Sequence, residues 1–516
     1  MGKIMAIEQV AAVFRIYGDN ILECEHFIEW LKKQELSQLE LKEELGSIDR
    51  PIYLFSDLKM KGKIYAFQLC PYYGGTGSQI LWPNNPLEDT FYEKTDVVVT
   101  RLMKNNSETK PILAIEFCDA LQAGNQAWQR FRRALDAAES KIPYFYVLPL
   151  IGWERDSEGI SLKNPRYQQA QVCTAQLTLI SKFGVPSLQI YTETSWSNYA
   201  KKLGYTLPED FEKFVGFNAA ISYASLLIRK SIGKADIESE AVELTRIIKE
   251  MFEVAQTYSK FSNTSLPIYL NHPAFQKDQL VKASEEYANA IVKGTSVTGR
   301  FALHEINFKD FEKFGSFFYK DVQDKTCSRE FEQKILSFLN WKKSKDVRYK
   351  ISYLMEWGVK MSPTLSSTEL DRLAEHNRRV IPLTYKENKS EAVVINNRNS
   401  LRRIIEKAYP NLDKKILNWI YSDEAENKGP IFLIPLYAYK PSGDSRPDRG
   451  LLPTLSALFP SLAIKENTLV IVYSKYTPNN WKNLIADEKN ELWNTISKLA
   501  GCIIVDKTED GTLLVS

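Results

Sequence analysis

At 516 residues the chain is too long for a single ordinary core, and it predicts two or three domains. Hydrophobic residues make up 44% and charged residues 25% of the chain, which excludes a disordered or fibrous protein. The formal net charge of +3 is too small to indicate a polyanionic partner by itself, so any basic surface has to be local.

The first half of the chain is expected to begin with helices and to continue as an α/β unit. Apolar residues recur three to four positions apart in 7–17 and 26–45, which predicts helices there. Runs rich in β-branched and aromatic residues predict strands at 51–58, 63–70, 96–103 and 112–117. A helix at 120–140 and strands at 142–150 and 186–193 follow. The order strand, strand, helix, strand favours an α/β core.

Long helical patterns separate this unit from the rest of the chain. They lie at 217–232 and 239–261, and they place a boundary near residue 235 and a helical connector up to about 300. The remainder has helical patterns at 328–345, 369–380 and 402–410, and then an alternation of strands at 430–439, 468–475 and 502–506 with helices at 451–459 and 479–500. The predicted domains are therefore 1–235, a connector at 236–300, and a second α/β domain at 301–516.

Cysteine and histidine usage excludes several kinds of site. The six cysteines are scattered without a CxxC pair, so neither a disulfide framework nor a zinc cluster is indicated, and a reducing cytoplasm is expected. The four histidines are isolated, which disfavours a zinc hydrolase and a Ser-His-Asp enzyme. The longest apolar run falls short of the ~20 residues that a membrane helix needs, so a soluble protein without a membrane partner is expected.

Two acids stand at the ends of neighbouring predicted strands. Asp96 opens the strand at 96–103, and Glu116 lies near the end of the strand at 112–117, inside an otherwise apolar run. If the two strands pair antiparallel, these ends lie together. Two carboxylates and the carbonyl of Phe117 would then form a hard oxygen site suited to Mg²⁺ or Mn²⁺. Such an ion polarises a phosphate and lowers the pKa of bound water, which predicts metal-assisted phosphodiester hydrolysis.

With these residues, the stretch from Glu88 to Pro149 resembles the PD-(D/E)XK superfamily of restriction-endonuclease-like nucleases. The core of that superfamily is a helix, a β-hairpin that carries Asp and (Asp/Glu)-x-Lys, then a helix and a strand. The resemblance implies that Asp96 and Glu116 are the two motif acids and that the Phe117 carbonyl helps to hold the metal. It also implies a central mixed sheet flanked by helices as the fold of the first domain.

The chain departs from the motif at one position, because Cys118 stands where the family has lysine. A thiol neither positions water well nor binds Mg²⁺ well. The resemblance implies that the following helix supplies the missing function, through Gln129, which resembles the glutamine of a QxxxY helix, and Arg133, four residues on. Gln129 would orient the scissile strand or water, while Arg130 and Arg133 would bind phosphates.

Plainer interpretations of the same residues stay open. Asp96 and Glu116 could be solvated strand ends, and the arginines an exposed helix face. Glu88 could be an extra acid of the kind that some branches of the superfamily use, or an ordinary turn acid. An acid left unpaired inside an apolar run would be costly, which favours a paired role for Glu116.

The C-terminal half offers basic residues mixed with aromatic ones. Lys342 and Lys343 lie between Trp341 and Tyr349, a mixture suited to contacts with a nucleic-acid backbone, although a solvated helix face is the alternative. Arg446 and Arg449 flank Asp448 in a charged loop, where they could form ion pairs with it or bind a phosphate. Alternatively, Asp448 and Lys475 could belong to a degenerate second nuclease-like core.

The sequence thus predicts a Mg²⁺- or Mn²⁺-dependent endonuclease that acts on nucleic acid, double-stranded DNA in the first place. The resemblance implies a role in restriction or anti-phage defence, with the C-terminal domain serving recognition, self-association or docking of a partner subunit. The alternative is a non-catalytic nucleic-acid-binding or scaffold subunit with a degenerate nuclease site. A third possibility is a sensor whose loop at Arg446 and Arg449 binds a phosphorylated ligand.

Overall fold

A computed structural model provides the fold of the chain. It describes residues 10–18, 20–47, 50–71, 95–104, 109–118, 126–149, 151–155, 162–167, 170–192, 215–261, 272–303, 351–355, 358–361, 380–381, 392–395, 398–408, 412–422, 431–437, 465–473, 500–507 and 511–515. No helix within these residues combines the length and the apolar character needed to cross a membrane.

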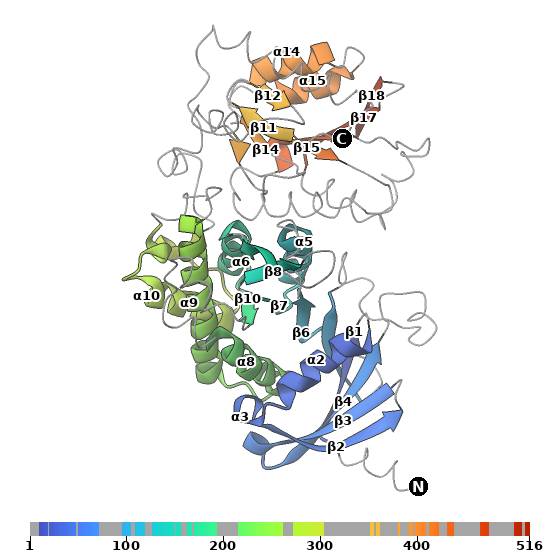
Figure 1. Ribbon diagram of the computed structural model, residues 1–516, viewed down its shortest axis with the longest axis vertical. Coiled ribbons are helices and arrows are strands. Elements are labelled where there is room, and N and C mark those ends of the chain that lie inside the picture. Colours follow the sequence, from blue (N-terminus) through green and yellow to red (C-terminus); the bar gives the residue numbers. More distant parts are fainter. Residues whose placement is uncertain are drawn as a thin grey trace.

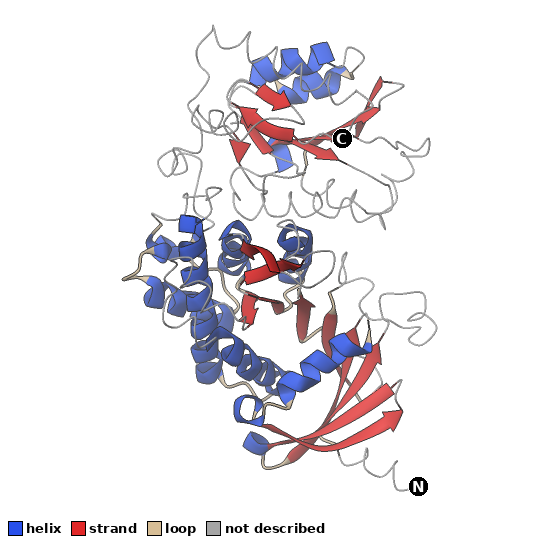
Figure 2. Ribbon diagram, in the orientation of Figure 1, coloured by secondary structure: helices blue, strands red, loops and turns tan. Residues whose placement is uncertain are grey.

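The N-terminal half is built on an eight-stranded mixed sheet with the strand order β10-β7-β6-β5-β1-β4-β3-β2. Its strands are β1 (Ala12–Gly18), β2 (Leu39–Ser47), β3 (Arg50–Asp57), β4 (Lys63–Pro71), β5 (Val97–Leu102), β6 (Leu113–Phe117), β7 (Tyr144–Pro149) and β10 (Ser187–Thr192). Helices flank this sheet, as Figure 2 shows. The predicted α/β class is therefore confirmed for this half of the chain.

The centre of the sheet combines antiparallel and parallel pairing. β5 pairs antiparallel with both β1 and β6, whereas β6, β7 and β10 are parallel to one another. Parallel neighbours need a crossover connection, and helices provide it here. The helix α5 (Gln126–Glu139) lies between β6 and β7 in the chain, and α6 (Ala170–Phe183) lies between β7 and β10. The ends of β5 and β6 are thus placed beside the start of a crossover helix.

The helix predicted at 7–17 is wrong, because its described part is the strand β1. Ala12, Phe14 and Ile16 are buried and alternate with half-buried Val13 and Arg15, which is the two-residue period of a strand. The short apolar run fits both periods, and pairing with β4 on one side and β5 on the other decides for the strand.

The helix predicted at 26–45 is correct only in its first part. The structure has α2 (Ile21–Leu31) and the short α3 (Gln34–Ser37), and then the edge strand β2. Gln38 adopts a left-handed conformation with φ of 57°, which ends α3 and turns the chain towards β2. The Lys and Glu residues of β2 favour a helix, but antiparallel pairing with β3 outweighs this propensity.

The remaining helices of this half lie along one side of the sheet (Figure 1). They are α8 (Val215–Ser231), α9 (Ile237–Phe261) and α10 (Leu280–Lys293). The predicted helices at 217–232 and 239–261 are confirmed as α8 and α9, whereas α6 and α10 had not been predicted. Because α9 packs against both α6 and α8, the predicted connector is in contact with the N-terminal half.

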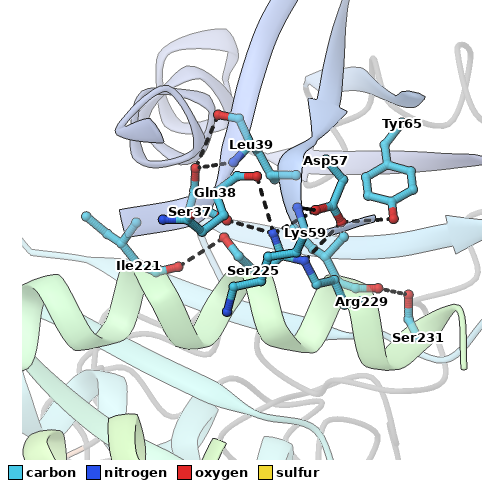
Figure 3. A network of polar contacts seen from close by, with 11 residues as sticks. Ser37, Gln38, Leu39, Asp57, Lys59, Tyr65, Ile221, Ser225, Arg229 and Ser231 are labelled. Carbon is cyan, nitrogen blue, oxygen red and sulfur yellow. Dashed lines mark hydrogen bonds and ion pairs between the residues drawn. The ribbon is translucent and has the colours of Figure 1, made fainter. Parts of the chain in front are cut away.

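A buried polar network joins α8 to the edge of the sheet (Figure 3). Arg229 of α8 donates from Nε and Nη2 to the two carboxylate oxygens of Asp57, at 2.9 and 3.1 Å, and from Nη2 to the carbonyl of Ser37 at 2.9 Å. The hydroxyl of Tyr65 donates to Asp57 Oδ2 at 3.0 Å. Asp57 is fully buried, so this pairing replaces the water that its charge loses.

The C-terminal half contains a second, six-stranded sheet with the order β13-β14-β15-β16-β17-β18. Its elements are β13 (Val380–Ile381), β14 (Ala392–Ile395), α14 (Arg398–Ala408), α15 (Lys414–Ile420), β15 (Ile431–Tyr437), β16 (Thr468–Tyr473), β17 (Cys502–Lys507) and β18 (Gly511–Val515). The predicted strands at 430–439, 468–475 and 502–506 and the helix at 402–410 are confirmed within the described residues. Two further pairs, β8 (Ile151–Arg155) with β9 (Leu162–Tyr167) and β11 (Ile351–Met355) with β12 (Gly358–Met361), form small sheets.

Four further predicted helices lie in parts of the chain that the structure does not describe. The segments 328–345, 369–379, 451–459 and 479–499 lie outside the described residues. The predicted domain limits at 235 and 300 stay a prediction.

Candidate active site

Asp96 and Glu116 meet at the paired ends of β5 and β6. The antiparallel register places Val97 of β5 opposite Ile115 of β6. Asp96, immediately before β5, is therefore next to Glu116, which follows Ile115 in β6. The backbone N–H of Asp96 donates to Glu116 Oε2 at 3.3 Å, and the N–H of Phe117 donates to Asp96 Oδ2 at 2.8 Å. The predicted juxtaposition of the two acids is therefore confirmed, and the hydrogen bonds hold their carboxylates side by side.

Two arginines from α5 neutralise this acid pair. Arg130 Nε donates to Glu116 Oε1 at 2.7 Å. Arg133 Nη1 forms an ion pair with the same Glu116 oxygen and lies 3.5 Å from Asp96 Oδ1. Arg130 and Arg133 are three residues apart and therefore lie on one face of the helix. The guanidinium group of Arg133 is thus a cation shared by both carboxylates.

Burial makes the ionised form of Asp96 unfavourable in this cluster. The Glu116 side chain is fully buried, and 14% of the Asp96 side chain is exposed. Burial first, and then the charge of Glu116, raise the pKa of Asp96 from 3.8 to about 8, while Arg133 and the Phe117 N–H act in the opposite direction. In this arrangement Asp96 is mainly protonated at neutral pH. A further cation at the site would favour its ionised form.

Glu23 is a neighbouring acid that the sequence did not suggest. It lies in the first turn of α2, where its N–H donates to the Asn20 side chain at 3.0 Å, and its charge contributes to the raised pKa of Asp96. A Cβ added to Gly18 would lie 3.2 Å from the Asp96 carbonyl, so the chain before α2 packs closely against the site. Because the predicted helix began only at residue 26, the pattern gave no signal for Glu23.

The residue in the position of the motif lysine, Cys118, is buried beside two tyrosines of β7. Its N–H donates to the Val147 carbonyl at 2.9 Å, and its side chain is on the same side of the sheet as that of Glu116, two residues earlier. Burial and the neighbouring Cys118 raise the pKa of Tyr146, and burial and Glu116 raise that of Tyr144. The nearby positive charge is supplied by Arg130, whose pKa responds to both Glu116 and Cys118.

The acid pair fits a hard divalent cation in its chemistry and placement. Arg133 Nη1 occupies a position within reach of one oxygen of each carboxylate, so a single cation can contact both. Within the described residues, no group of three or more histidine, cysteine, aspartate or glutamate side chains is arranged to hold a metal ion. A bound Mg²⁺ would therefore complete its shell with water and substrate oxygens, which is its usual habit in proteins.

Other predicted site residues are placed only in part. Gln129 is in the first half of α5, but its side chain is outside the described residues. Arg132, on the same helix, forms a buried ion pair with Asp136 at 2.8 Å and so faces away from the acids. The positions of Glu88, Lys342, Lys343, Arg446 and Arg449 lie outside the described residues.

Comparison of the chain with protein-family models, with curated proteins and with solved structures gives no match.

Proposed function

We propose that the chain is a metal-dependent nuclease of the restriction-endonuclease-like kind, which hydrolyses phosphodiester bonds in DNA. The observation that carries the proposal is the convergence of the Asp96 and Glu116 carboxylates on one cation position, where Arg133 now lies. Two acids buried this close to one position are unfavourable unless a positive charge lies between them. Metal-assisted hydrolysis uses this kind of oxygen site.

The order of elements supports the same proposal. The family core pairs a β-hairpin that carries the two acids with a following helix and strand. In this chain β5 and β6 carry the acids, α5 follows, and β7 returns parallel to β6. These elements occur in the expected order, and the acids sit at the expected strand ends.

The roles of the side chains follow from their contacts. Asp96 and Glu116, with the Phe117 carbonyl, would hold Mg²⁺ or Mn²⁺, which supplies phosphate polarisation and a water of lowered pKa when bound. The N–H of Phe117 orients Asp96. Arg130, next to Cys118 and Glu116, places a fixed positive charge where the motif lysine is missing. A guanidinium can stabilise the charge of a phosphate, although it is a poor proton donor.

The test is cleavage by the purified full chain of supercoiled plasmid, single-stranded DNA and RNA, with Mg²⁺ or Mn²⁺ and with EDTA. Asp96→Asn and Glu116→Gln should each lower the cleavage rate by about 10²-fold or more, since each removes a charged metal ligand. Glu139→Gln is the matched control, because Glu139 is an exposed acid at the end of α5. Equal cleavage by all four proteins would refute the assignment.

A second candidate function is a non-catalytic nucleic-acid-binding or scaffold subunit. It is favoured by the two arginines, which already neutralise the acids, and by the buried thiol of Cys118 in place of lysine. This protein would bind double-stranded DNA without cutting it, with an affinity that falls steeply with salt and is unchanged by EDTA. Under either function, restriction or anti-phage defence in the cytoplasm and self-association or a partner subunit remain part of the proposal.

A further inference from the structure

We propose that Arg133 is a built-in competitor of the divalent cation, and that it exchanges the acid pair for a substrate phosphate when the metal binds. The inference rests on the metal-binding half of the proposed function and adds how that site is regulated. It assigns Arg133 two alternative partners: the carboxylates of Asp96 and Glu116 in the metal-free protein, and a phosphate of nucleic acid in the loaded one.

The guanidinium group of Arg133 lies where a metal bound to both acids would lie. Arg133 Nη1 is in ion-pair contact with Glu116 Oε1 and 3.5 Å from Asp96 Oδ1, so it occupies the point at which one cation serves both acids. A divalent cation bound to the same two oxygens would be too close to this charge to coexist with it. The metal and Arg133 therefore compete for one position.

The Arg133 side chain can leave the carboxylates of Asp96 and Glu116 without unfolding of α5. Of its side chain, 21% is exposed, although both acids are largely buried. A long, flexible arginine stem can turn its head group towards solvent while the helix stays in place. The helix itself is anchored elsewhere, through buried Phe131, Ala134 and Leu135.

The consequence is a coupling between metal and substrate. Because only protein in which Arg133 has left the acids can bind the metal, the apparent affinity for the metal is the intrinsic affinity multiplied by that fraction of the protein. A phosphate that captures the guanidinium removes the competitor and so raises the affinity for the metal. By linkage, the metal raises the affinity for the phosphate by the same factor. The nucleic acid would thereby complete its own catalytic centre.

The experiment measures Mn²⁺ binding to the full chain by electron paramagnetic resonance, without nucleic acid. Arg133→Gln should bind Mn²⁺ about tenfold or more tightly than the wild type, because a competing charge is removed. Arg133→Lys keeps the charge and should stay within about threefold of the wild type. Arg130→Gln, which removes the other cation from Glu116, is the matched control and should show a smaller gain than Arg133→Gln.

Thermal melting separates this effect from misfolding. Arg133→Gln should melt below the wild type in EDTA, since two acids lose their shared cation, and Mn²⁺ should restore the melting temperature. Arg133→Met keeps the aliphatic stem and provides the same comparison if the Gln variant does not fold. Unchanged or weaker Mn²⁺ binding by folded Arg133→Gln or Arg133→Met, or no Mn²⁺ binding by any protein, would overturn the inference.

A third arm tests the predicted coupling with a short phosphorothioate duplex. The duplex should increase the Mn²⁺ affinity of the wild type by a larger factor than that of Arg133→Gln, and equal factors would contradict the exchange. Failure of the inference and failure of the nuclease proposal are distinguishable. Tighter Mn²⁺ binding by Arg133→Gln without any DNA cleavage would support competition between Arg133 and the metal and would refute the nuclease activity.

Discussion

Two buried clusters in this chain are built from the same carboxylate and guanidinium groups, but they pair these groups differently. In the cluster at the sheet edge, one acid, Asp57, faces one arginine, Arg229, through two parallel hydrogen bonds. At the candidate site, Asp96 and Glu116 share Arg133, and Glu116 also accepts a hydrogen bond from a second arginine, Arg130. The first arrangement satisfies each charge where it lies. The second brings two acids to one guanidinium, where the charge of Glu116 disfavours ionisation of Asp96, and stability alone does not require this arrangement.

The difference separates a structural ion pair from a candidate functional one. Arg229 also donates to the Ser37 carbonyl, and Tyr65 donates to Asp57, so the sheet-edge cluster ties α8 to the strand that carries Asp57 (Figure 3). The acid pair instead has a carboxyl whose pKa is raised to about 8, at a point where both acids lie within reach of Arg133. Perturbed carboxyls of this kind concentrate at functional sites.

The largest expected effect separates the two clusters by stability. Asp57→Ala leaves the buried Arg229 without its carboxylate and should cost about 3–5 kcal/mol in the free energy of unfolding. Asp96→Asn should not destabilise the protein at pH 7 and should stabilise it by up to about 4 kcal/mol, because folding of the wild type at this pH requires protonation of a carboxyl that is ionised in the unfolded chain. Urea unfolding followed by circular dichroism measures both. Similar losses for the two variants would show that the acid pair is as structural as the sheet-edge pair.

A smaller effect is expected in the pH dependence of stability. The pKa of Asp96 is raised in the folded protein from 3.8 to about 8, so the folded state holds this proton more tightly than the unfolded chain. Its contribution is fully present below pH ~4 and is lost as pH rises towards about 8, with a slope of about 1.4 kcal/mol per pH unit at most. Melting temperatures of wild type and Asp96→Asn should therefore be closest at pH 5 and should diverge as pH rises to 8, because only the wild type loses this contribution. Parallel curves would contradict the raised pKa.

The smallest expected effect compares two tyrosine hydroxyls. Tyr65→Phe removes the hydroxyl that donates to Asp57 at 3.0 Å and should cost about 1–2 kcal/mol. The hydroxyl of Tyr144 is buried without a hydrogen-bond partner among the described residues. Tyr144→Phe should therefore be neutral, or stabilise the protein by up to about 1 kcal/mol. A loss for Tyr144→Phe as large as that for Tyr65→Phe would indicate a partner for this hydroxyl, such as bound water.

The sequence by itself determined the strands at 96–103 and 112–117, the helix after them, and the meeting of Asp96 with Glu116. These features are local: apolar runs mark the strands, and a short connection between them favours antiparallel pairing. The same reasoning predicted α8 and α9, whose apolar periodicity extends over many residues.

Only the tertiary structure decided the features that depend on distant partners. The segment 7–17 fits a helix or a strand by its pattern, and its place between β4 and β5 made Ala12–Gly18 a strand. Glu23 comes close to Asp96 because α2 packs on β1 and β5, although more than 70 residues separate them in the chain. The choice of Arg133 as the cation between the acids, with Arg132 turned to Asp136, depends on how α5 is rotated against the sheet. That rotation is set by burial of the whole helix face, which no single motif encodes.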